Sequence, residues 1–135
     1  MTKKKLNDGA KVHDVIAKLK ALEKALRQRV TKLERQGCEN LNLHIKSGTN
    51  KMFHRGGSPD PKTGQRDYRY IGTDPKKQQD ALDRVKRYKE REQLLWNLRK
   101  LAQQIERLEE AISEMADDAK DMLDEWRGTQ LELLG

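Results

Sequence analysis

The chain of 135 residues contains a single cysteine, three prolines and few aromatic side chains, which make up 4% of its residues. A lone cysteine, Cys38, excludes an intramolecular disulfide and is typical of a reducing compartment. No apolar run has the length of a signal-peptide core or a membrane span, so we expect a cytoplasmic protein with no membrane partner. With 34% hydrophobic and 38% charged residues, the chain cannot fill a thick core, and long, thinly packed helices suit this balance.

The charge is unevenly divided along the chain. The formal net charge is +7, yet residues 106–135 hold ten acidic and three basic side chains, so the first 105 residues carry +14. A strongly basic segment favours an anionic partner, and nucleic acid is the first candidate. This division of charge predicts that the basic and acidic segments have two different functions, or that they form two surfaces of one assembly.

Apolar residues repeat at helical spacing in the first segment, residues 1–37, which begins with a basic arm. The spacing predicts a helix over 9–36, capped by Asp8 and ended by Gly37 in the left-handed conformation. Glu23 occupies the one missing place of its heptad seam. The seam consists of Val12, Ile16, Leu19, Leu26, Val30 and Leu33.

Between residues 38 and 73 the period changes to that of β-strands. Apolar and polar residues alternate in NLNLHIKS (40–47), and KMFHR (51–55) and QRDYRYI (65–71) predict two further strands. DPKTG (60–64) predicts a hairpin turn whose glycine is left-handed. Three short strands in succession are most simply an antiparallel meander.

A second, longer helix is predicted over residues 74–128, with a tail at 129–135. Asp74 can cap it, and Pro75 fits the first helical position because its missing N–H is not needed there. No glycine or further proline precedes Gly128. Its heptad seam, which predicts the surface for oligomerisation, comprises Leu94, Leu98, Leu101, Ile105, Leu108, Ile112, Met115, Ala119, Met122 and Trp126.

The fold class that follows is mostly α with a small antiparallel sheet. We expect a long helical hairpin or coiled-coil bundle with an inserted three-stranded β-sheet. Apolar residues also flank the seam, which makes it wider than that of a two-stranded coiled coil and favours a bundle formed by self-association. The number of copies and the helix orientation stay open. Ala81, Val85 and Tyr88 follow a different frame, which predicts packing on the sheet.

Motifs for catalysis are weak or missing. The letters YIG at Tyr70–Gly72 match half of the signature of GIY-YIG nucleases, but LHI stands upstream in place of GIY and an uninterrupted helix follows. Cys38, His44 and His54 are three residues, whereas structural zinc takes four ligands. A phosphate-binding glycine loop followed by Lys-Ser/Thr is missing as well. We therefore expect no enzyme activity, no metal and no cofactor.

The middle of the chain, residues 41–72, is strongly basic and predicts a nucleic-acid interface. Strands can enter the major groove, where bidentate side chains distinguish base edges. Tyr68 and Tyr70 are either core residues or contacts, and the exposed face of the sheet stays open. Double-stranded DNA is the expected partner, and RNA is an alternative that these residues do not separate from it. The candidate contacts are His44, Lys46, Lys51, His54, Arg55, Lys62, Arg66 and Arg69.

NLHIK (42–46), KMFHR (51–55) and DPKTGQRDYRYIGTDPKKQQDALDRV (60–85) together resemble the amino-terminal arm-binding domain of phage lambda-type tyrosine recombinases over residues 41–88. The resemblance implies a three-stranded antiparallel sheet followed by a helix, related to AP2-type plant DNA-binding domains, that lies in the major groove. Because a helical bundle flanks the sheet in place of a recombinase catalytic domain, it implies a DNA-binding module encoded by a phage or mobile element. The contacts it implies are His44, Lys46, His54, Arg55, Arg66 and Arg69, with Lys62 as the basic turn residue.

The acidic end of the second helix has two interpretations. It provides solubility and pairs with the basic first helix, or it docks a basic protein. In the second case the chain is a protein-binding inhibitor or adaptor of anti-defence type, acting on a nucleic-acid-handling complex. The residues for such docking are Glu109, Glu110, Asp117 and Asp118. Our leading prediction is a non-enzymatic, self-associating DNA-binding protein that uses its basic sheet.

Overall fold

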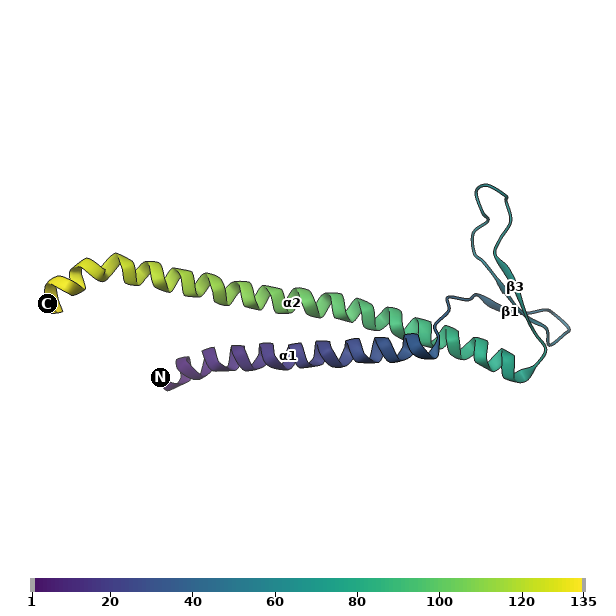
Figure 1. The fold of residues 1–135 in the computed structure, drawn as a ribbon, viewed down its shortest axis with the longest axis horizontal. Helices are drawn as coiled ribbons and strands as arrows, with labels where there is room; N and C mark the ends of the chain where they lie inside the picture. Colours follow the sequence, from purple (N-terminus) through teal and green to yellow (C-terminus); the bar gives the residue numbers. More distant parts are fainter. Residues whose placement is uncertain (1, 135) are drawn as a thin grey trace. The chain divides into compact units, whose positions relative to one another are not determined.

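A computed structural model describes the backbone of residues 2–134 and the side chains of residues 9–129. In the chain order, a small three-stranded antiparallel sheet lies between two long helices (Figure 1). This confirms the predicted mostly α fold with an inserted sheet. The elements are α1 (Thr2–Gln36), β1 (Leu43–Ile45), β2 (Met52–Arg55), β3 (Tyr68–Gly72) and α2 (Pro75–Leu134). Neither helix, over the part of the chain described, is long and apolar enough to cross a membrane.

Helix α1 begins earlier than its sequence pattern predicts. The predicted start at residue 9 with Asp8 as its cap is wrong, because the helix begins at Thr2 and runs through Asp8 and Gly9. A glycine inside a helix costs about 1 kcal/mol relative to alanine, which does not stop a segment rich in lysine. The predicted end is confirmed: Gly37 has a φ of +101°, and its N–H donates to the carbonyl of Leu33 at 3.1 Å.

Helix α2 begins where it is predicted to begin and ends later. The Asp74 side chain accepts a hydrogen bond from the Lys76 N–H at 3.0 Å, so Asp74 caps the helix and Pro75 is its first residue. The predicted end at Gly128 is wrong, because the helix continues to Leu134. A Cβ added at Gly128 would meet no described atom outside its own helix backbone within 4 Å, so the effect of this glycine is the propensity cost.

The three strands form the predicted meander, with β2 in the centre and antiparallel pairing on both sides. The predicted third strand is too long, because β3 begins at Tyr68 rather than at residue 65. Residues 56–67 instead form a loop, which is closed by backbone hydrogen bonds from the Gly56 N–H to the Asp67 carbonyl and from the Asp60 N–H to the Gln65 carbonyl. The predicted turn at its tip is confirmed by Gly64, whose φ is +69°.

The chain divides into two compact units, residues 1–25 with 98–135 and residues 26–97. In the first unit Ile16 of α1 and Leu98, Leu101 and Ile105 of α2 are buried, as the predicted seams require. Lys20 of α1 pairs with Glu109 of α2 at 3.3 Å across this unit. The basic first helix thus makes an ion pair with the acidic end of the second.

In the second unit the helices are antiparallel. Arg29 of α1 binds Glu90 of α2 at 3.0 Å, while Arg87, one turn earlier in α2, donates to the carbonyl of Gly37 at 2.7 Å. The core of this unit consists of Val30, Leu33, Met52 and Ala81. Burial of Ala81 is in line with its predicted place against the sheet rather than in the bundle seam.

The seam of α2 is only partly covered. Leu98, Leu101 and Ile105 are buried, whereas Met115, Met122 and Trp126 are each more than 60% exposed. The heptad spacing of the sequence therefore continues beyond the residues that the first unit buries. A coiled coil or bundle that covers this segment stays a prediction.

Candidate nucleic-acid interface

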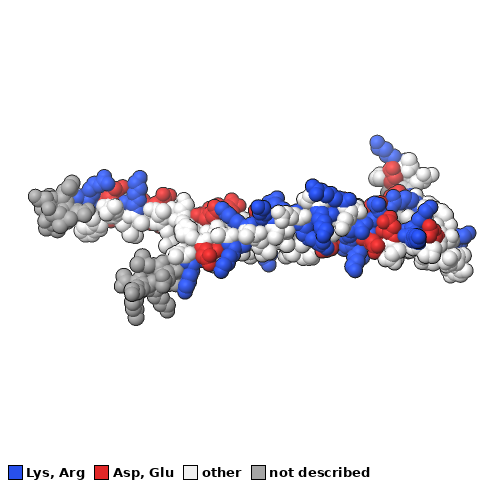
Figure 2. All heavy atoms as spheres, turned by 60° about the horizontal axis from the view of Figure 1, so that its bottom comes forward, with Lys and Arg blue, Asp and Glu red and all other residues white. Residues whose placement is uncertain are grey.

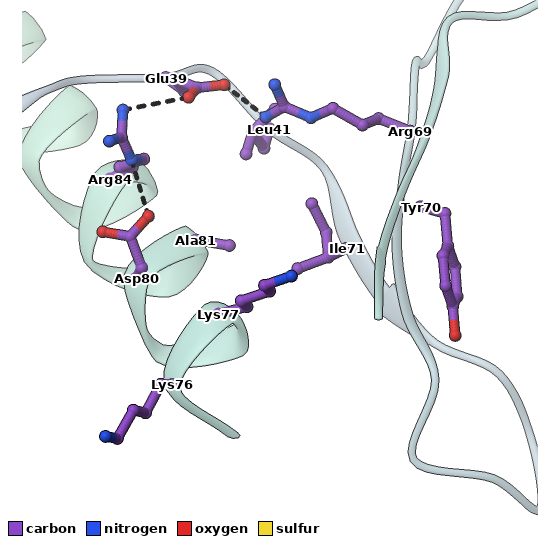
Figure 3. A pocket seen from close by; sticks show the side chains of 10 residues that line it. All are labelled: Glu39, Leu41, Arg69, Tyr70, Ile71, Lys76, Lys77, Asp80, Ala81 and Arg84. Atoms are coloured by element: carbon purple, nitrogen blue, oxygen red, sulfur yellow. Dashed lines mark hydrogen bonds and ion pairs between the residues drawn. The ribbon is translucent and has the colours of Figure 1, made fainter. Parts of the chain in front are cut away.

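The sheet has one face toward α2 and one face away from it. Ile71 points toward the start of α2, whereas Tyr70 points to the opposite side of β3 (Figure 3). The side chains that share the face of Tyr70 form what we call the outer face. They are His44, Lys46, Lys51, Phe53, Arg55, Tyr68 and Tyr70, as the cross-strand register sets out below.

The register places these residues in three rows across the sheet. His44, Phe53 and Tyr70 lie opposite one another in the middle row, and Arg55 lies opposite Tyr68 in the next. On the other side of the middle row, the Lys46 N–H donates to the Lys51 carbonyl at 2.9 Å, which places these two lysines opposite each other. Lys51, Phe53 and Arg55 therefore place a cation, an aromatic ring and a second cation one after another on the outer face.

Aromatic rings occupy the middle of the outer face. The ring of Phe53 lies 5.5 Å from that of His44 and 5.6 Å from that of Tyr68, with the planes inclined by 27° and 29°. Tyr68 is 62% exposed and Tyr70 is 55% exposed. The sequence left the two tyrosines as core or contact; the structure excludes the core. A row of stacked rings is left open on the surface of the sheet.

The opposite, inner face contains His54, which the sequence predicted as a nucleic-acid contact. That prediction is wrong, because His54 is only 6% exposed and both of its ring nitrogens are engaged. The Asn42 N–H donates to Nδ1 at 2.9 Å, and Nε2 lies 3.0 Å from the Asp67 carboxylate. Since Nδ1 accepts the Asn42 N–H, Nε2 is the ring nitrogen that donates to Asp67. His54 ties the segment before β1 to the loop before β3.

Arg69 was also predicted to belong to the interface, but it lies on the inner face and pairs with Glu39 (Figure 3). The second carboxylate oxygen of Glu39 accepts from Arg84 of α2 at 3.2 Å, and Arg84 also binds Asp80 at 2.9 Å. The hydrogen bond and charge of Asp80 raise the pKa of Arg84 above its usual value, with Glu39 adding to the effect. Glu39 therefore connects β3 to α2.

These ion pairs line a hollow of about 520 Å³ between the inner face of the sheet and the start of α2. Its walls combine apolar and charged side chains: Leu41, Ile71 and Ala81 lie beside the cations Lys76 and Lys77. The charged groups nearest β3 are already bound to one another (Figure 3).

Basic side chains also occur in the loop between β2 and β3, the 56–67 loop, which carries Lys62 and Arg66. Both residues are exposed, and basic side chains project from this loop in the space-filling view (Figure 2). The Lys62 N–H donates to the Asp60 side chain at 2.8 Å, which fixes the turn that carries it. Arg66 directly precedes Asp67 and Tyr68, so the loop adds cations beside the Arg55 row.

The other residues considered from the sequence lie apart from this face or are already paired. Cys38 donates to the Leu33 carbonyl at 3.3 Å, and His44 and His54 lie on opposite faces of the sheet. Among the described residues no group of three or more His, Cys, Asp or Glu is arranged to hold a metal ion. Glu109 is bound to Lys20, while Glu110, Asp117 and Asp118 are exposed on α2.

Comparison with known proteins adds no relative: no family model, no curated protein sequence and no solved structure matches the chain. The resemblance to the arm-binding domain of tyrosine recombinases thus stays a prediction from the residues. The main feature that sequence reasoning missed is Phe53 as the centre of the aromatic row. The alternation of Phe53 with Arg55, and of Tyr68 with Tyr70, was the available signal. It could not be used because Met52 and Phe53 are both apolar and adjacent.

Proposed function

We propose that this chain is a non-enzymatic, self-associating DNA-binding protein whose outer face grips the phosphate backbone. The observation that carries the proposal is the placement of Lys46 directly opposite Lys51, where Lys46 follows the last residue of β1 and Lys51 precedes the first residue of β2. Like charges in that position destabilise a sheet. A bound anion would relieve the repulsion, and phosphate is the anion that runs of Lys and Arg most commonly contact in nucleic-acid-binding proteins.

The charge of the surrounding surface supports the same proposal. None of the residues in β1, β2 or β3 is acidic, and Arg55 lies on the outer face at the other end of the aromatic row. Lys62 and Arg66 extend the basic surface into the 56–67 loop. The distance along β2 from Lys51 to Arg55 is about 13 Å at roughly 3.3 Å per residue, so the two groups of cations can contact different phosphates.

Self-association rests on the uncovered part of α2. Met115, Met122 and Trp126 continue the heptad seam but are exposed, on a segment that is strongly acidic. The same acidic segments of two copies would repel each other, whereas α1 is basic and leaves Val15 and Leu22 exposed. We therefore assign the α1 helix of a second copy as the occupant. Two sheets held in one assembly raise the affinity for DNA through effective concentration.

The test is a comparison of two variants with equal charge. In the first, Lys46, Lys51 and Arg55 are replaced by glutamine. In the second, Lys86, Lys89 and Arg99, which are exposed on α2 outside the sheet and outside the proposed association surface, are replaced by glutamine. Because only the first removes phosphate contacts, its affinity for duplex DNA at low salt should fall by at least about tenfold while the second stays near the wild type. Equal losses of affinity in both variants would show that binding depends on the net charge of the chain and not on the outer face, which would contradict the proposal. The absence of any binding by the wild-type chain would contradict it as well.

A further inference from the structure

The middle row of the outer face consists of aromatic rings rather than the Arg, Lys, Asn and Gln side chains that most often read base pairs. Bases in a duplex are distinguished at their edges, mainly by Arg, Lys, Asn and Gln. His44, Phe53 and Tyr70 lie opposite one another in this row, and Tyr68 stacks on Phe53 from the adjoining row. Such rings offer π faces, which bases already stacked in a duplex cannot reach.

The rings are also too exposed to be explained by packing alone. Both tyrosines keep more than half of their surface in contact with solvent, and no part of the described chain covers them in the way that Met52 and His54 are covered on the inner face. Exposed, ordered aromatic side chains beside cations are the elements of sites for unpaired nucleic acid, in which bases stack on rings and cations hold the backbone.

From this arrangement we propose that the outer face binds single-stranded nucleic acid, with unpaired bases stacked on Tyr68 and Tyr70. Lys46 and Lys51 hold the backbone at one end of the row, and Arg55 holds it at the other. The inference rests on the proposed function, since it assigns the form of nucleic acid that the same face prefers. Duplex DNA uses the cations alone, whereas a single strand uses the cations and the rings.

The first experiment requires no mutation. Fluorescence anisotropy of the wild-type chain compares a labelled oligothymidine of about 12 nucleotides, a length within the range that single-strand modules cover, with an abasic oligonucleotide of equal length and with a duplex. All three carry phosphates, but only the oligothymidine has unpaired bases. It should bind at least about tenfold more tightly than the abasic strand, because each stacked base contributes substantially to affinity. Equal affinities for the thymidine and abasic strands would overturn the proposal. A parallel measurement with oligouridine then distinguishes RNA from DNA. Tighter binding of oligouridine identifies RNA as the preferred ligand, and tighter binding of oligothymidine identifies DNA.

The second experiment uses variants of the full chain. Tyr68→Ala with Tyr70→Ala should weaken oligothymidine binding at least about tenfold and leave duplex binding within about twofold, while Tyr68→Phe with Tyr70→Phe retains the rings and the affinity. Circular dichroism checks that each variant is folded. Equal losses of affinity for single strand and duplex would overturn the inference and leave the proposed function standing. A wild-type chain that binds neither ligand would overturn both. A change from oligomer to monomer in the alanine variant, with single-strand binding unchanged, would assign the rings to a second copy and also overturn the inference.

Discussion

The ring of Phe53 on β2 lies 5.6 Å from the ring of Tyr68 on β3, with the two planes inclined by 29°. Aromatic pairs of this kind contribute about 0.5–1.5 kcal/mol beyond the area they bury. A double-mutant cycle with Phe53→Leu and Tyr68→Thr, measured by urea unfolding, should therefore give a coupling energy in that range. A cycle that combines Phe53→Leu with Tyr88→Leu on α2 is the control. Equal coupling in the two cycles would show that the ring contact has no energy of its own.

Replacement of the buried histidine should destabilise the protein. In His54→Leu the part-buried hydrogen bond from the Asn42 N–H to the ring is lost, and a hydrogen bond of this kind contributes about 0.5–1.5 kcal/mol. Asp67→Asn should cost less than about 0.5 kcal/mol, because the Asp67 side chain is 81% exposed and the oxygen of an asparagine amide can still accept a hydrogen bond from Nε2. Urea unfolding measures both values. A larger destabilisation in Asp67→Asn than in His54→Leu would contradict the role assigned to the ring.

The glycine at the end of α1 should resist substitution. Gly37 has a φ of +101°, and a Cβ added there would lie 2.8 Å from the Arg84 guanidinium. Gly37→Ala should therefore lower the free energy of unfolding by about 1–2 kcal/mol, chiefly through backbone strain. At Gly48 the φ of +75° would strain an alanine, but an added Cβ would meet no atom within 4 Å. At Gly57 an alanine would have neither a positive φ nor a close atom at its Cβ. The expected destabilisation is well above that of Gly57→Ala for both Gly37→Ala and Gly48→Ala, and a costly Gly57→Ala would contradict this reasoning.

The fold could be predicted from the sequence largely because its signals are local. Gly37, Gly64 and Asp74 each carry a backbone requirement in one residue, and all three are found in the conformation or bond expected of them. The start of α1 and the end of α2 could not be predicted, because Gly9 and Gly128 weaken a helix without stopping it. Propensity alone does not mark such ends.

The candidate interface was harder to predict than the fold. The cations were visible in the sequence, but which of them share a face depends on how each strand pairs with its neighbour, which no local pattern reports. The burial of His54 depends on partners that are 12 and 13 residues away in the chain. Arg69 resembles the other strand cations until Glu39 is brought beside it. Long-range pairing decides these residues.

The assembly should depend on the exposed seam of α2. Replacement of Met115, Met122 and Trp126 by glutamine removes apolar surface that is exposed in the single chain, so the folded monomer should keep its stability while the oligomer dissociates. Light scattering measures the mass. The control replaces Ser113, Lys120 and Arg127, which lie off the seam and are not acidic, by glutamine as well. An unchanged mass in the seam variant would contradict self-association through this surface.

The salt dependence of duplex DNA binding tests the central proposal most directly. If cations of the outer face contact phosphates, a plot of log K against log salt should be linear, with a slope of about −0.9 for each phosphate contacted. Replacement of Lys46, Lys51 and Arg55 by glutamine should make the slope less steep by roughly 0.9 for each phosphate that the variant no longer neutralises, while replacement of Lys86, Lys89 and Arg99 by glutamine leaves it unchanged. A wild-type affinity that does not vary with salt, or the same slope in the outer-face variant, would contradict the account.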